Sequence, residues 1–174
     1  MSQSLSSFAD LLRAVEHTAV HLELRDDYDM GNETAGFEAW KQGDRLDPAD
    51  RASWWRPWLD LVQEVTAKGV RIQRARVVTE PPTEYIRYEH SFTFTNVAAG
   101  EEVRWLPRGS TAGIALPEHD FWLFDGHLVQ FNVFDDAGRW IRTDQTEEPV
   151  AVAGCVRAFD DVWDRAIPHE KYSF

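Results

Sequence analysis

The chain has 174 residues, of which 43% are hydrophobic and 13% aromatic, and this content excludes a chain that is disordered throughout. Its formal net charge of −12 argues against sequence-independent binding of nucleic acid, which depends on lysine and arginine side chains. The single cysteine, Cys155, excludes an internal disulfide and a metal centre built from several thiolates, and no apolar run is long enough to span a bilayer.

The N-terminal part of the chain predicts three helices and one strand. The first seven residues contain neither a basic region nor an apolar stretch, so we expect no signal peptide and a cytoplasmic location. An apolar stripe predicts a first helix, and alternating apolar and polar positions then predict a strand. A turn follows at residues 26–31, and two further helices are expected, the second with Pro57 near its start and Gly69 as its stop. The predicted helices cover residues 8–15, 33–40 and 54–68, and the strand covers residues 19–25.

The central part begins with a strand at residues 70–79, which two prolines end. Residues 85–95 allow two interpretations: the spacing of Tyr85, Tyr88 and Phe92 is typical of a helix, whereas the later alternation is typical of a strand. We favour a helix that reaches at least His90, because Pro82 with the residues after it is typical of a helix start. A turn is expected at residues 96–100, a short strand at 102–106 and irregular structure at 107–116.

The C-terminal part predicts three antiparallel strands and a closing helix. Asp125-Gly126 is a two-residue turn signal between strands at 121–124 and 127–134, and a third strand at 140–146 completes a meander. The helix is expected at residues 147–166, with a buried side that contains Val150, Cys155, Phe159, Val162 and Trp163. Without a repeat or a linker, residues 1–174 therefore predict one layered α+β domain, with a mainly antiparallel sheet flanked by helices.

Arginines gather in the centre of the chain, where residues 68–108 carry 7 basic and 5 acidic side chains. Arg74 and Arg76 share one face of the predicted strand because side chains alternate along it, and Arg87 and Arg104 lie downstream. Converging guanidinium groups can form an anion pocket. Pairing with acidic residues nearby is the alternative that we favour, and the candidates are Glu80, Glu84, Glu89, Glu101 and Glu102.

Other constellations are weaker. His119 and Asp120 could serve as acid–base groups together with Glu89, although neighbours on an extended chain point to opposite faces. No histidine spacing indicates a metal site, and the sequence contains no nucleophile elbow or phosphate loop, so we assign no catalytic residue, metal or cofactor. Trp54 and Trp55 are mainly core candidates, of which one could anchor a protein partner.

Several motifs resemble an actinobacterial family, the domain-of-unknown-function family numbered 6879. They are Trp58-Leu59, Gly69, Arg74-x-Arg76-Val77-Val78-x-Glu80-Pro81, Tyr85-x-Arg87-x-Glu89, Asn96, Ala99-Gly100-Glu101, Arg104-Trp105-Leu106-Pro107 and the run Asp120-Phe121-Trp122-Leu123-Phe124-Asp125. The similarity extends from Phe8 to about Tyr172. Members are often encoded beside helix-turn-helix regulators, so the resemblance implies a regulatory or conflict setting and no established activity.

A weaker resemblance is to the phospholipase-D-like fold, including its inactive regulatory versions. It rests on the helix that ends at Gly69 before Val-Arg-Ile and on the later Phe-Trp-Leu-Phe-Asp-Gly hairpin. The catalytic signature of that fold is His-x-Lys-x4-Asp. Here His119 is followed by Phe121 in place of lysine and by Gly126 in place of aspartate, so phosphodiester chemistry is in doubt.

The leading hypothesis is therefore a non-enzymatic regulatory module that binds a protein partner, plausibly a helix-turn-helix regulator, with no nucleic acid or membrane bound directly. The alternative is an enzyme or a small-anion or nucleotide-binding domain of degenerate phospholipase-D-like type. Its pocket would use Arg74, Arg76, Arg87, Arg104, Glu89, His119 and Asp120. A third hypothesis, a DNA mimic, follows from the net charge alone.

Overall fold

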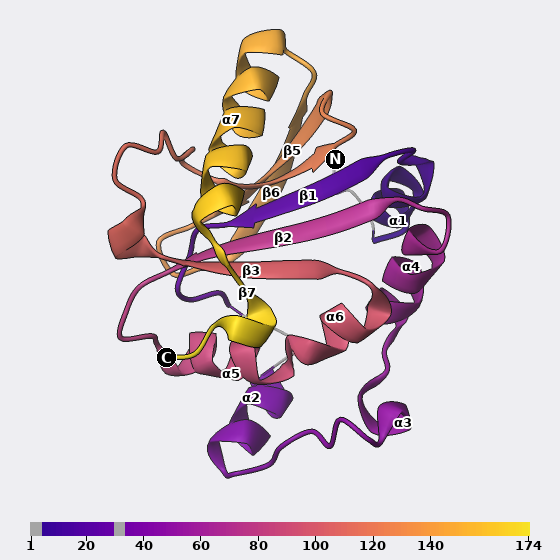
Figure 1. Ribbon diagram of the computed structural model, residues 1–174, viewed down its shortest axis with the longest axis vertical. Coiled ribbons are helices and arrows are strands. Elements are labelled where there is room, and N and C mark those ends of the chain that lie inside the picture. The colour runs from indigo at the N-terminus through magenta and orange to yellow at the C-terminus, as the bar shows by residue number, and fades with distance from the viewer. Residues whose placement is uncertain (1–4, 30–33) are drawn as a thin grey trace.

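A mixed sheet of seven strands organises the fold of the computed structural model, which describes residues 5–29 and 34–174. The strand order is β6-β5-β4-β1-β2-β3-β7; β1, β2 and β3 run parallel, and every other neighbouring pair is antiparallel (Figure 1). The strands are β1 (Thr18–Glu23), β2 (Arg71–Val78), β3 (Glu102–Pro107), β4 (Asp120–Phe124), β5 (Leu128–Phe134), β6 (Trp140–Thr146) and β7 (Ile167–Pro168). The α+β prediction is confirmed.

Helices cover both faces of this sheet. They are α1 (Leu5–Ala14), α2 (Thr34–Lys41), α3 (Arg51–Trp54), α4 (Pro57–Thr66), α5 (Glu84–Phe92), α6 (Phe94–Ala99) and α7 (Pro149–Arg165). In Figure 1, α7 crosses one face of the sheet, and α1 and α4 lie together at the end where β1 and β2 begin. Among the described residues, no helix combines the length and the apolar character needed to cross a membrane.

The alternation of side chains along the strands separates two buried clusters. Leu22, Val77 and Phe121 belong to the cluster that contains Phe159 and Val162 of α7. The opposite face carries a second cluster. It includes Leu12 of α1, Val62 and Val65 of α4, Ile72, and Trp122 with Phe124 of β4. Because each fully buried large apolar side chain contributes about 1.5–3 kcal/mol, both clusters stabilise the fold.

The C-terminal meander is confirmed. Asp125 and Gly126 both have positive φ, 47° and 68°, as a tight hairpin turn requires. The Asp125 carboxylate accepts hydrogen bonds from the backbone N–H groups of Glu16, His17 and Thr18 at 2.8–2.9 Å. The turn between β4 and β5 is thereby attached to the chain that enters β1.

The predicted helix at residues 54–68 is wrong in its first part, because the structure contains two helices there. Arg56 is extended (φ −139°, ψ 162°) and separates α3 from α4. A residue before proline is pushed out of the helical region by the ring, so Pro57 starts a new helix and cannot continue the old one.

Two other expectations are corrected. The predicted turn at residues 96–100 is mostly α6, and Gly100, at φ 108°, is the left-handed residue that ends it. Val150 is 78% exposed, because it lies two residues, or about 200° around the helix, from the buried stripe that begins at Val152. The expected turn at 26–31 and helix at 33–40 fall partly outside the described residues; α2 covers Thr34–Lys41.

Candidate ligand-binding cleft

Polar side chains occupy the middle of the sheet on the face opposite α7. His21 and Glu23 of β1, Arg74 and Arg76 of β2, and Asp120 of β4 are each at most 9% exposed. They share this face because each sits two residues from the next on its strand, and the parallel register sets His21 beside Arg74 and Glu23 beside Arg76. The local pattern is that of an ordinary half-polar strand, but here the polar half is buried.

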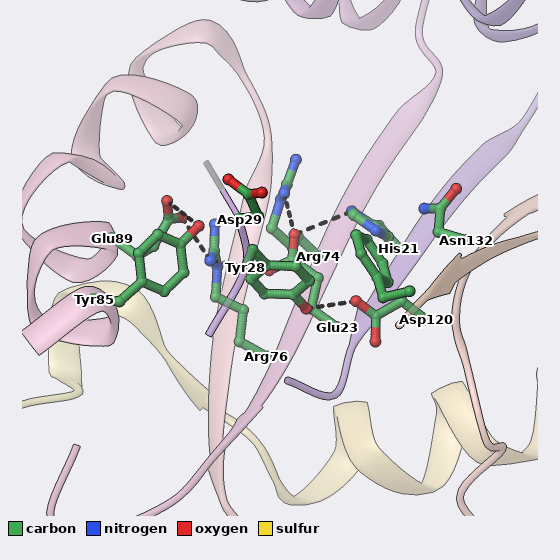
Figure 2. A pocket seen from close by; sticks show the side chains of 11 residues that line it. His21, Glu23, Tyr28, Asp29, Arg74, Arg76, Tyr85, Glu89, Asp120 and Asn132 are labelled. Atoms are coloured by element: carbon green, nitrogen blue, oxygen red, sulfur yellow. Dashed lines mark hydrogen bonds and ion pairs between the residues drawn. The ribbon is translucent and has the colours of Figure 1, made fainter. Parts of the chain in front are cut away.

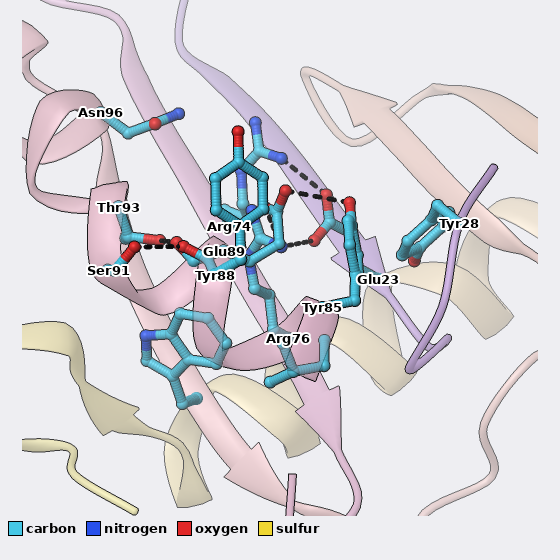
Figure 3. Close-up of polar contacts among 12 residues, drawn as sticks. Glu23, Tyr28, Arg74, Arg76, Tyr85, Tyr88, Glu89, Ser91, Thr93 and Asn96 are labelled. Atoms are coloured by element: carbon cyan, nitrogen blue, oxygen red, sulfur yellow. Dashed lines mark hydrogen bonds and ion pairs between the residues drawn. The ribbon is translucent and has the colours of Figure 1, made fainter. Parts of the chain in front are cut away.

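Glu23 is the centre of an ion network (Figure 3). Its two oxygens lie 2.6 Å from Arg74 Nη1 and 2.9 Å from Arg76 Nη1. Arg74 Nε also contacts Glu101 Oε1 at 2.6 Å, and Arg76 Nη1 contacts Glu89 Oε2 at 2.6 Å. Each guanidinium therefore has two carboxylate partners, one from β1 and one from outside the first two strands.

The electrostatics of this network favour the charged forms. Burial alone would raise the pKa of Glu23, but Arg76 and Arg74 outweigh it and lower that pKa to about 2. Burial likewise opposes the charge on the two guanidinium groups, and their carboxylate partners raise both arginine pKa values. The two guanidinium groups face three carboxylates within the network, so their charges are already neutralised.

His21 and Asp120 border the network on its β4 side. Burial lowers the pKa of His21 to about 3, so its ring is neutral at pH 7, and it stacks on Trp122 at 4.3 Å between centroids. Asp120 accepts hydrogen bonds from the backbone N–H of Leu24 at 2.9 Å and from the Tyr28 hydroxyl at 2.5 Å. Burial raises the pKa of Asp120 to about 7, so its charge changes near neutral pH.

Two adjoining hollows lie over these buried polar side chains, which form their floor. Their volumes are about 290 Å³ and 370 Å³. The first, shown in Figure 2, is lined by polar groups that include Tyr28, Glu23 and Asp120. The second is lined by aromatic and amide side chains. Because Arg74, Arg76, Glu89 and Asn132 line both hollows, the two form one cleft.

Some polar atoms of the cleft are left without hydrogen bonds. Arg76 Nε and His21 Nδ1 are buried and have no hydrogen-bond partner among the described residues. His21 Nδ1 comes within 3.5 Å of Glu23 Oε1 without hydrogen-bond geometry. An unsatisfied buried polar group costs about 1–3 kcal/mol, so the floor of the cleft is not optimised for stability alone.

The structure brings together four of the seven residues proposed from the sequence: Arg74, Arg76, Glu89 and Asp120. Arg87 is exposed, with its guanidinium 5.7 Å from the centroid of the Phe174 ring. Arg104 lies on the α7 face, where it donates to the Trp163 carbonyl at 3.0 Å. His119 is partly buried just before β4 and lines neither hollow.

The two tryptophans considered as partner anchors lie outside the cleft. Trp54 is 7% exposed and donates its Nε1–H to the Asp47 carbonyl at 3.1 Å. Trp55 is partly buried, donates to Asp60 Oδ1 at 2.6 Å and has the Arg51 guanidinium 3.6 Å above its ring.

Sequence reasoning missed several members of the cleft. His21 and Glu23 fall on the polar side of the strand predicted at residues 19–25, and no pattern marks Tyr28, Gln130 or Asn132. One signal was available: His21 and Glu23 are two residues apart on one strand, as Arg74 and Arg76 are on the other. Each pair therefore lies on a single face of its strand. Across residues 5–29 and 34–174, no three His, Cys, Asp or Glu side chains gather in a way that could hold a metal ion.

Residues 6–173 match the family model described as "Domain of unknown function (DUF6879)". No curated protein matches the chain. Solved structures that match include NucT from Helicobacter pylori, with 8% identity, 94% of this chain and 89% of that chain covered, and a TM-score of 0.53. TrmBL2, an archaeal chromatin protein with a novel mode of DNA binding, is 13% identical, with a TM-score of 0.50; the match covers 92% of this chain and 48% of that one.

Nuc, a phospholipase D family member from Salmonella typhimurium, also matches, with 8% identity, 92% and 86% of the two chains covered, and a TM-score of 0.49. At such low identity these similarities concern the fold alone.

Proposed function

We propose that this chain, which belongs to the DUF6879 family of domains of unknown function, binds a small polar molecule in the cleft and does not transform it chemically. The observation that carries the proposal is the pair of adjoining hollows of about 290 Å³ and 370 Å³ over a buried polar floor. Ligand pockets commonly hold ~300–1,000 Å³ and combine apolar walls with a few fixed polar groups.

The ion network makes a simple anion a poor ligand for this cleft. Arg74 and Arg76 already contact Glu23, Glu89 and Glu101 at 2.6–2.9 Å, so a phosphate would have to compete with three carboxylates. A neutral polar molecule avoids this competition and can still bond to the edges of the network. The anion-pocket alternative is therefore replaced by a pocket for an uncharged ligand.

The chemistry of the lining favours binding over catalysis. The residues that line the two hollows include no serine, cysteine or lysine, and their one histidine, His21, is 8% exposed with its ring stacked on Trp122. The phospholipase D signature fails at Phe121 and Gly126.

A regulatory role with a helix-turn-helix protein as partner stays a prediction of the sequence, as does the cytoplasmic location. The net charge of −12 suits a basic protein partner better than DNA. In this proposal ligand binding and partner binding use different surfaces, since the cleft is a concave site of small-molecule size.

Thermal unfolding against a panel of uncharged polar metabolites tests the proposal. At least one compound should raise the melting temperature of the wild type in a concentration-dependent way. Asn132→Trp, which places a large ring in both hollows, should abolish that shift. Arg142→Trp, at a 57% exposed side chain on the opposite face of the sheet, is the matched control and should retain it. A panel without any stabilising compound, or a shift that persists in Asn132→Trp, contradicts the proposal.

A further inference from the structure

The second hollow has an aromatic wall. Phe8, Trp58 and Trp122 form a cluster with ring centroids 5.2–6.2 Å apart, and Phe92 lines the same hollow. These rings come from α1, α4, β4 and α5, so they surround the space from several directions. Such a wall favours a flat, π-rich ligand, because flat ring systems stack on aromatic side chains whatever substituents they carry.

Amide side chains stand beside this wall. Asn96, Gln130 and Asn132 line the second hollow, and Asn132 also lines the first. Asn96 already donates to Glu101 and Gln130 already accepts from Gln145, so Asn132 is the amide that faces a ligand. A carboxamide offers one donor group and one acceptor side by side, which is the pattern presented by the edge of a nucleobase. The Asn132 amide makes no side-chain hydrogen bond to another described residue, and Figure 2 shows it at the border of the network.

The first hollow offers groups that suit hydroxyls. Glu23 and Asp120 provide carboxylate oxygens, and Tyr28 and Tyr85 provide phenol groups. Glu23 Oε2 is buried and lies 2.9 Å from Arg76 Nη1, but it makes no hydrogen bond of good geometry to a described residue. Neighbouring sugar hydroxyls donate readily to carboxylates, whereas a phosphate beside the same oxygens is repelled.

We infer that the ligand is a nucleoside, with its base against Trp58 and its sugar hydroxyls toward Glu23 and Asp120, and without a phosphate. This inference rests on the proposed function, because it names the class of ligand for the same cleft. The two hollows adjoin at Asn132, as a base and a sugar joined by one glycosidic bond require.

Isothermal titration calorimetry with adenosine, guanosine, cytidine and uridine tests the inference. At least one nucleoside should bind. The free base, ribose and the 5′-monophosphate should each bind about tenfold more weakly or worse, because each loses one half of the contacts or adds repulsion. Inorganic phosphate alone should not bind.

Variants separate the base site from the rest of the fold. Trp58→Leu should weaken nucleoside binding about fivefold to a hundredfold by loss of stacking. Trp163→Leu, on the α7 face where Trp163 stacks on Phe159, is the matched control and should leave binding unchanged. Asn132→Leu, at a partly exposed position, provides a second test if Trp58→Leu does not fold, and it should weaken binding of the base and the nucleoside alike.

The outcomes distinguish a failure of the nucleoside inference from a failure of the proposed function. If no nucleoside binds but another polar metabolite does so in a manner that Asn132→Trp blocks, the nucleoside inference fails and the proposed function stands. If nothing in either panel binds, both fail. Tighter binding of the monophosphate than of the nucleoside also overturns the inference, and it would identify a phosphate site.

Discussion

Arg76 of β2 and Glu89 of α5 form an ion pair at 2.6 Å, with 7% and 6% of their side chains exposed. The pair joins the sheet to a helix that follows it in the chain, and Glu23 joins it from β1 at 2.9 Å. Removal of one partner therefore leaves the others charged in a dry environment, and the consequences are measurable.

Arg76→Gln should destabilise the protein by roughly 3–5 kcal/mol, because Glu23 and Glu89 are then buried without their shared partner. Arg87→Gln is the matched control at an exposed position of the adjacent helix and should stay within about 0.5 kcal/mol of the wild type. Urea unfolding of both variants measures the difference. Equal free energies of unfolding for Arg76→Gln and the wild type, together with stabilisation of the wild type by millimolar phosphate, would show instead an open anion site.

Arg74 and Glu101 should show strong energetic coupling. Their side chains are 10% and 0% exposed, and Arg74 Nε donates to Glu101 Oε1 at 2.6 Å. Each single change to methionine should cost roughly 3–5 kcal/mol, whereas the double variant should cost less than the sum, since it removes both charges of the pair and Glu23 keeps Arg76 as a partner. A double-mutant cycle by chemical unfolding gives the coupling. Additive effects would mean that the contact is energetically unimportant.

Asp120→Asn should raise stability at neutral and alkaline pH. The folded protein raises the pKa of Asp120 to about 7 from a usual 3.8, so the folded state holds this proton more tightly than the unfolded chain. The contribution of Asp120 is therefore largest below pH 4, falls as pH rises to about 7 and is constant above, a change on the order of 4 kcal/mol. Asparagine can keep the contacts to Leu24 and Tyr28 without ionising.

His21 partly masks this effect in the wild type. Because its pKa is lowered from 6.5 to about 3, its contribution to stability rises with pH between those values and opposes that of Asp120. The informative measurement is thus the difference in unfolding free energy between Asp120→Asn and the wild type from pH 4 to pH 8. A difference that does not change with pH contradicts the prediction.

Asp125→Ala should destabilise the protein by about 1–3 kcal/mol. Its carboxylate accepts three backbone hydrogen bonds at 2.8–2.9 Å, from Glu16, His17 and Thr18, and alanine leaves these donors without their acceptor. Asp136→Ala, an exposed aspartate in the next turn of the meander, is the control and should have little effect. Thermal unfolding of the two variants, with the circular dichroism spectrum as a check on the fold, measures the contrast.

The purified protein should not cleave a phosphodiester reporter and should contain no stoichiometric transition metal. The first expectation follows from Phe121 and Gly126 at the positions of the phospholipase D lysine and aspartate. Elemental analysis and a reporter assay, with His119→Ala as comparison, measure both. Turnover that this variant abolishes, or about one zinc per chain, would overturn the non-enzymatic function.

Much of the fold could be predicted from short sequence patterns. The Asp125-Gly126 dipeptide gives the hairpin because both residues tolerate positive φ, and the spacing of Cys155, Phe159 and Val162 marks the buried side of α7. Where a local rule was overlooked, as with the residue before Pro57, one predicted helix became two.

The cleft could be predicted only in part, because its partners are distant in the chain. Arg74 and Arg76 could be placed on one face from their spacing, but Glu23 lies about fifty residues earlier and meets them only through the parallel pairing of β1 and β2. No local pattern distinguishes a polar strand face that meets water from one that is covered by α5 and α6.

The network around Arg76 has a consequence for how α5 is aligned. An apolar helix face can slide along a sheet and still find apolar contacts, whereas a shift of α5 by one turn, about 5.4 Å, would carry Glu89 out of reach of the guanidinium 2.6 Å away. The buried ion pair thus permits only one position of the helix along the strand. Because α5 forms one wall of the cleft, its fixed position also fixes the width of the cleft.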